Sequence, residues 1–143
     1  MIHRDIKPSN VMMTEDRHCK IGDFGTAVTN ETCHRGVLNG TRRYQAIESF
    51  RGVSNDARSD VYSLAVCVWE ILSRRVPWGP GQRTVFDANV APGAMPTAWG
   101  QTANALQLCF AYPEDRLSAD ELATAIEDAL SEGETGGAGS GIM

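Results

Sequence analysis

The chain has 143 residues, of which 42% are hydrophobic and 22% are charged, and its formal net charge is -5. This length and composition predict one globular domain with a single core, without room for a second full domain. The negative charge argues against a nucleic-acid partner. The longest apolar run, residues 61–72, is too short to cross a bilayer and contains Ser63 and Glu70, so we expect no membrane contact.

The spacing of the thiols indicates a reducing compartment. No C-x-x-C pair occurs and no secretory signal is recognisable, so free cysteines in the cytosol or nucleus are expected. A metal site built from His18-Cys19 and Cys33-His34 is an alternative, although the short ligand spacings of structural zinc sites are missing. The four cysteines are Cys19, Cys33, Cys67 and Cys109.

The first part of the chain predicts a loop followed by a β-hairpin. Residues 1–10 are polar and dense in charge, and residues 11–14 form an apolar stretch of strand length. A polar turn separates them from a second short strand, residues 19–21. The hairpin places Asn10 and Asp23 at its open end.

A long loop and a central helix are expected next. Residues 26–40 are polar and show neither helical nor strand periodicity, which is typical of a functional loop. Residues 44–50 predict a short helix. Residues 61–73 are hydrophobic on nearly every side, so they predict a central buried helix, with Ser59 and Asp60 as its cap.

The remaining segments are helical apart from the end of the chain. Residues 84–91 predict a weak helix, and residues 102–110 carry apolar side chains at helical spacing. Ser118 with Glu121 forms a capping box that opens a further helix ending near residue 130. The expected fold class is therefore mainly α with a small β-hairpin. Residues 131–143 are rich in glycine and predict a disordered tail.

Two short motifs carry the chemistry. Residues 3–10, HRDIKPSN, resemble the catalytic loop of protein kinases, and residues 23–25, DFG, resemble the metal-binding motif that follows it. Their order, and the hairpin between them, are specific to that family. The resemblance implies an incomplete α+β C-terminal kinase lobe over residues 1–130, without the Gly-rich phosphate loop or the strand lysine.

The resemblance assigns a role to each polar residue of these motifs. Asp5 would accept the proton of the substrate hydroxyl, and Lys7 would offset charge on the γ-phosphate of ATP. Asn10 and Asp23 would supply oxygen ligands for Mg²⁺. Residues 40–48 resemble the end of a kinase activation loop, in which Thr41 bonds Asp5 and Lys7. Thr41 together with Lys7 implies protein substrates with Ser or Thr acceptors.

Further residues are implied to support the site. His3 would pack against Phe24, and Glu48 would form a buried ion pair with Arg116, unless both are simply exposed charges. Asp60 would anchor the backbone of the catalytic loop, act as a plain helix cap, or do both.

Regulation and subgroup are also suggested by resemblance. Arg4 precedes Asp5, as in kinases whose activation loop is ordered by phosphorylation, so Thr29 or Thr32 is predicted to accept phosphate. Residues 22–27 and 69–77 resemble the tyrosine-kinase-like group, including TGF-β-activated kinase and related MAP kinase kinase kinases. A MAP kinase kinase is accordingly an expected protein partner.

Two readings of the whole chain remain. As a Ser/Thr kinase lobe without its N-terminal lobe, this chain alone is expected to be inactive and poorly stable, with apolar surface exposed around residues 61–72. The alternative is a catalytically inactive module that binds a kinase or its regulators. The presence of Asp5, Lys7, Asn10 and Asp23 argues against loss of catalysis.

Overall fold

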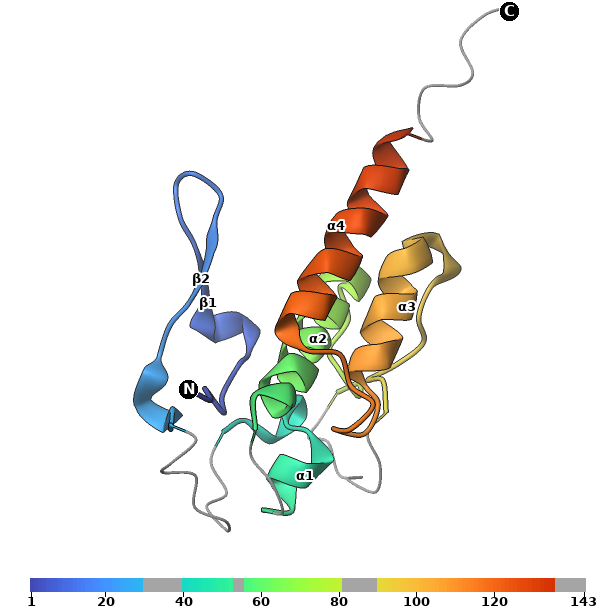
Figure 1. The fold of residues 1–143 in the computed structure, drawn as a ribbon. Helices are drawn as coiled ribbons and strands as arrows, with labels where there is room; N and C mark the ends of the chain where they lie inside the picture. Colours follow the sequence, from blue (N-terminus) through green and yellow to red (C-terminus); the bar gives the residue numbers. More distant parts are fainter. Residues whose placement is uncertain (30–39, 53–55, 81–89, 136–143) are drawn as a thin grey trace, which may run out of the picture.

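The computed structural model describes residues 1–29, 40–52, 56–80 and 90–135. Within these ranges the chain is mainly helical and carries one two-stranded antiparallel sheet, which is the fold class predicted from the sequence. The hairpin stands beside a group of three longer helices (Figure 1). No helix in the described ranges is long and apolar enough to cross a membrane.

The predicted hairpin is present. Strand β1 (Val11–Met13) pairs with β2 (Cys19–Ile21), and Val11 lies opposite Ile21. One further backbone bond extends the pairing beyond the strands, since Gly22 N donates to Asn10 O at 2.8 Å. This bond holds the residue before Asp23 against Asn10 at the mouth of the hairpin.

The long apolar helix α2 (Ala57–Ser73) begins earlier than predicted. Its N-cap is Asp56, whose side chain accepts from Arg58 N at 2.8 Å, so the cap expected at Ser59 and Asp60 was wrong. An Asp just before the helix satisfies a free N–H of the first turn as well as Ser59 would. Asp60 lies inside that turn, and its carboxylate bonds the catalytic loop instead.

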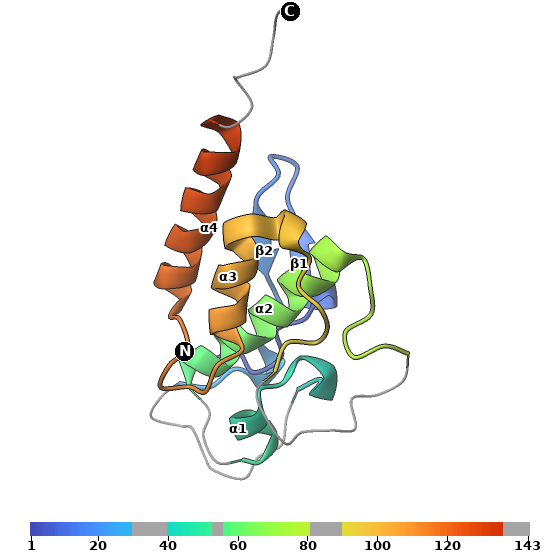
Figure 2. The ribbon, with the colours of Figure 1, turned by 90° about the vertical axis from the view of Figure 1, so that its right-hand side faces the viewer.

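The core forms where α2, α3 (Gly100–Cys109) and α4 (Ala119–Thr135) pack together (Figures 1 and 2). Tyr62, Ala65 and Val66 of α2 have no exposed surface. The expectation of exposed apolar surface around residues 61–72 was therefore wrong for most of this segment, because α3 and the chain around it cover the helix. It holds only at the C-terminal end, where Ile71 is 63% and Leu72 42% exposed.

Other boundaries also differ from prediction. The helix expected over residues 44–50 is two short ones, η4 (Arg42–Tyr44) and α1 (Ile47–Phe50), separated by extended backbone at Gln45. Helix α4 opens with the predicted capping box: Ser118 N donates to Glu121 Oε2 at 2.7 Å, and Glu121 N to Ser118 Oγ at 3.3 Å.

Helix α4 also ends later than predicted. It continues to Thr135, so residues 131–135, assigned to the tail, are helical. A single glycine costs a helix only about 1 kcal/mol, which the preceding turns offset. The rest of the predicted tail, residues 136–143, lies outside the described residues. The helix predicted over residues 84–91 also lies outside them, apart from residues 90 and 91.

Candidate active site

Asp5 lies at the centre of a closed hydrogen-bond network. Its Oδ1 accepts from the backbone N and the hydroxyl of Thr41, both at 2.8 Å, and its Oδ2 accepts from Lys7 Nζ at 2.8 Å. Lys7 Nζ also donates to Thr41 Oγ1 at 2.9 Å. Thr41 is 36 residues from Asp5 in sequence, so the fold brings the two motifs together.

The network keeps Asp5 ionised. Burial by itself would raise the pKa of Asp5, but hydrogen bonds from Lys7 and Thr41 favour the carboxylate and hold the pKa below its ordinary value of 3.8. The result is an anionic, oriented carboxylate at neutral pH. Such a group can accept a proton from a hydroxyl that approaches it.

Asn10 and Asp23 present oxygen atoms at the mouth of the hairpin. The amide nitrogen of Asn10 donates to Asp5 O at 2.8 Å, which leaves Oδ1 as its available ligand atom. Asp23 adopts a left-handed backbone with φ of 57°, and its Oδ1 accepts from Gly25 N at 3.3 Å. One carboxylate and one amide oxygen fit Mg²⁺, which takes few protein ligands and completes its shell with water and phosphate.

A metal cage made of protein side chains alone is not present in the described residues. Among residues 1–29, 40–52, 56–80 and 90–135, no three His, Cys, Asp or Glu side chains could jointly hold a metal ion. Of the alternative zinc ligands, Cys33 and His34 lie outside the described residues. His18 is exposed and within 3.7 Å of Asp16.

Asp60 holds the backbone of the catalytic loop from α2. Its two oxygens accept from His3 N at 2.7 Å and from Arg4 N at 2.9 Å, across more than 50 residues of sequence. Arg4 has a φ of 70°, a left-handed conformation that a non-glycine residue adopts only when its surroundings stabilise it. Burial raises the pKa of Asp60, although both backbone bonds oppose the shift. Since Asp56 is the N-cap, Asp60 is an anchor rather than a cap.

Replacing Asp60 by Asn is expected to destabilise the protein by about 1.5 to 3 kcal/mol. In the variant, the amide NH₂ would face one of the two backbone N–H groups, which in the wild type donates to a charged oxygen. Urea unfolding measures the difference. Asp56→Asn is the matched control, since Asn caps a helix about as well as Asp. Equal losses in the two variants would contradict the anchoring role.

His3 and Arg4 brace the DFG segment. The His3 ring lies edge-on to Phe24 with centroids 4.9 Å apart, and its Nε2 is 2.9 Å from Gly22 O. Its Nδ1 lies 3.3 Å from the backbone N of Asp5, which donates to it. Arg4 Nε donates to Thr26 O at 2.5 Å. These contacts position the loop, which is consistent with a structural role for His3.

The two predicted phosphorylation sites differ in what the structure describes. Thr29 is exposed, while Thr32 lies outside the described residues. Regulation through Arg4 and either threonine therefore stays a prediction.

A buried ion pair joins Glu48 of α1 to Arg116. Arg116 Nη1 lies 2.6 Å from Glu48 Oε1 and Nη2 lies 3.3 Å from Oε2, and the two residues are only 2% and 7% exposed. Ser59 Oγ donates to Glu48, Ala111 O accepts from Arg116, and the Tyr62 ring lies 5.2 Å from the guanidinium. The alternative of two exposed charges was wrong.

Sequence reasoning missed two supporting residues. Gly40 has a φ of 99°, and a Cβ there would lie 2.3 Å from Arg4 O, so only glycine brings Thr41 this close to the catalytic loop. Ser59 donates to the buried carboxylate of Glu48, a role that a Ser near a helix start does not signal. The role of Gly40 could have been inferred from the sequence, because Gly40 directly precedes Thr41.

The chain is similar to known protein kinases. Residues 1–127 match the protein kinase domain. The chain is 33% identical over 141 residues to the serine/threonine-protein kinase mos of Gallus gallus, covering 85% of this chain and 40% of that protein. It is 31% identical over 148 residues to mos of Xenopus laevis, covering 89% and 41%.

A bacterial relative matches a shorter stretch. The serine/threonine-protein kinase PknB of Mycolicibacterium smegmatis is 40% identical over 83 residues, which cover 54% of this chain and 13% of that protein. The chain thus spans about 40% of the length of the two mos proteins and less of PknB. On the match to the kinase domain over most of its length, the chain belongs to the protein kinase family.

Proposed function

We propose that this chain carries the phosphoryl-transfer residues of an ATP-dependent Ser/Thr protein kinase. The observation that supports this most is the ionised Asp5 carboxylate, bonded to both Lys7 and Thr41, with the amide nitrogen of Asn10 donating to the Asp5 carbonyl. Phosphoryl transfer depends mainly on positioning and charge neutralisation, with little covalent work for the protein. These side chains supply both.

Each residue has a distinct task in this proposal. Asp5 accepts the proton of a Ser or Thr hydroxyl, and Lys7 offsets negative charge on the phosphate being transferred. Asn10 Oδ1 and the Asp23 carboxylate would hold Mg²⁺, which when bound neutralises charge on the ATP phosphates. The presence of Lys7 and Thr41 at these positions, by resemblance to Ser/Thr kinases, favours Ser or Thr acceptors over Tyr.

The narrower features of the proposal come from resemblance. A MAP kinase kinase is the proposed protein substrate, on the likeness of residues 22–27 and 69–77 to the tyrosine-kinase-like group. Phosphate on Thr29 or Thr32, bound by Arg4, is the proposed activating event. The absence of a disulfide pattern in the sequence favours the cytosol or nucleus as the place of action.

The test is an Asp23→Asn variant of the full-length protein, titrated with ATP in the presence and absence of Mg²⁺. Removing one negative charge from a ligand of a hard divalent cation is expected to weaken Mg²⁺-dependent ATP binding about tenfold or more, with a parallel loss of phosphate transfer to a Ser/Thr peptide. Isothermal calorimetry and radiolabelled phosphate incorporation measure the two effects.

Asp16→Asn is the control, because it makes the same chemical change at a side chain that is 73% exposed in the hairpin turn. If Asp23→Asn leaves both affinity and activity unchanged, the metal assignment fails. A wild-type protein that binds neither ATP nor Mg²⁺ and transfers no phosphate would instead favour the inactive interaction module.

A further inference from the structure

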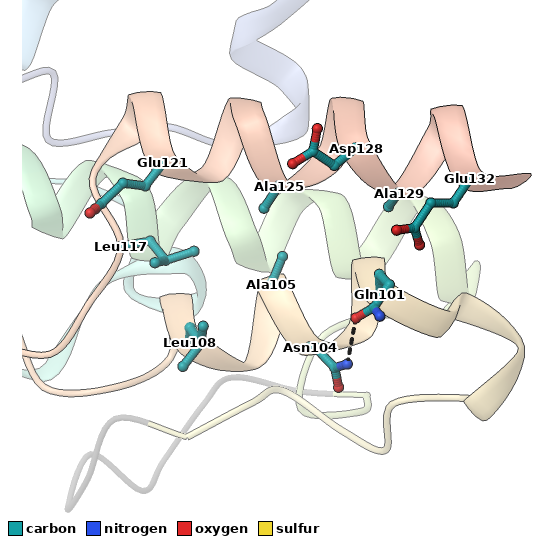
Figure 3. Close-up of a pocket in the computed structure, with 10 residues that line it drawn as sticks. All are labelled: Gln101, Asn104, Ala105, Leu108, Leu117, Glu121, Ala125, Asp128, Ala129 and Glu132. Atoms are coloured by element: carbon teal, nitrogen blue, oxygen red, sulfur yellow. Dashed lines mark hydrogen bonds between the residues drawn. The ribbon is translucent and has the colours of Figure 1, made fainter.

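A groove of about 360 Å³ lies between α3 and α4, and none of the active-site residues lines it. Three of the residues that line it have small side chains: Ala105 on α3, and Ala125 and Ala129 on α4 (Figure 3). Leu108 forms part of the apolar lining and is 50% exposed. This leaves apolar surface open to an external side chain.

The rim of the groove on α4 is acidic. Glu121, Asp128 and Glu132 all line it, at spacings of seven and four residues that place them on one face of the helix (Figure 3). No Lys or Arg is among the lining residues, and the last turn of α4 holds no basic residue to offset the negative end of the helix dipole. The field over the groove therefore favours a cation.

The two ends of this rim differ. Glu121 accepts from Ser118 in the capping box, which lowers the pKa of its carboxyl group, and the positive charge of Arg58 also acts on it. The side chain of Asp128 makes no hydrogen bond or ion pair within the described part of the chain. The carboxylate of Asp128 is therefore the group of this rim that an external cation would meet, and the negative charge of Glu132 lies one turn further on.

We propose that this groove binds a cationic amphipathic helix from a partner protein. At 1.5 Å per residue, the acidic face of α4 from Glu121 to Glu132 is about 16 Å long, which matches about three turns of a bound helix. One aliphatic side chain of the partner would contact Leu108 and the alanines. A Lys or Arg side chain of the partner would pair with Asp128, and a second one, one turn away, would be attracted by the negative charge of Glu132. This binding does not depend on phosphate transfer.

The probe is a fluorescein-labelled designed helical peptide with Leu on one face and Lys on both flanks, added to the full-length protein and followed by fluorescence anisotropy. A double variant, Asp128→Asn with Glu132→Gln, is expected to weaken binding about three- to thirtyfold, with the larger effect at low salt. Leu108→Ala is expected to weaken it as well, independently of salt.

Glu127→Gln is the matched control, because Glu127 lies on the same helix, is exposed and does not line the groove. A photo-crosslinking group on the Leu face of the peptide should label α3 or α4, and thermal unfolding shows that each variant is folded. The proposal is overturned if the control weakens binding as much as the double variant, or if a Glu-flanked peptide binds equally well.

Two other occupants would also overturn it. Concentration-dependent dimerisation that the double variant abolishes would assign the groove to a second copy of the chain. Stronger peptide binding after removal of residues 136–143 would assign it to the end of the chain itself.

Discussion

Replacing Asp5 by Asn is expected to lower kcat by about 10²- to 10⁴-fold in the full-length protein, the usual contribution of a positioned proton acceptor. Asn can still accept the two bonds from Thr41 through Oδ1, so the network should keep its shape. What it loses is the anionic oxygen beside Lys7 and the capacity to take a proton. Steady-state phosphorylation of a Ser/Thr peptide measures the effect, and thermal unfolding checks the fold.

The pH dependence gives a second readout. In the folded protein the pKa of Asp5 lies below its ordinary value of 3.8. The hydrogen bonds to its carboxylate therefore stabilise the fold at pH values above 3.8, and this stabilisation is lost as the pH falls through the folded pKa. Asp5 is thus ionised throughout the neutral range. Any change in rate between about pH 5.5 and 8 should come from another group and persist in the variant. Asp5→Asn activity within about threefold of an Asp16→Asn control would exclude Asp5 as the proton acceptor.

Replacing Arg116 by Met is expected to destabilise the protein by about 3 to 5 kcal/mol, because Glu48 would remain buried without its cation. Urea unfolding measures the loss. Arg75→Met is the matched control: Arg75 is exposed, and such changes usually stay within about 0.5 kcal/mol.

A double variant separates the pair from its parts. Glu48→Leu with Arg116→Met removes both charges, so it should cost less than Arg116→Met alone, since buried ion pairs often exchange for apolar residues at little net cost. If the double variant is less stable than the single one, the loss in Arg116→Met does not come from leaving Glu48 buried without its cation. If Arg116→Met lowers the free energy of unfolding no more than Arg75→Met does, the ion pair does not stabilise the protein.

Local patterns were read correctly where local interactions decide the structure. The apolar stretch and the polar turn in residues 11–21 predicted the hairpin, and the capping box at Ser118 predicted the start of α4. The predictions were wrong where several neighbouring residues could play the same structural role. Asp56, Ser59 and Asp60 can all cap a helix, and only the contact of Asp60 with the catalytic loop decides which one does.

The sequence alone determined the chemistry that is local: Asp5, Lys7 and Asn10 share one loop, and a short hairpin carries the chain from Asn10 to Asp23. Only the tertiary structure decided the rest. Thr41 reaches Asp5 across 36 residues, Asp60 reaches His3 across 57, and Arg116 reaches Glu48 across 68. Family resemblance suggested these partners, but no periodicity does, because such contacts depend on how the helices pack around α2 and on the backbone freedom of Gly40.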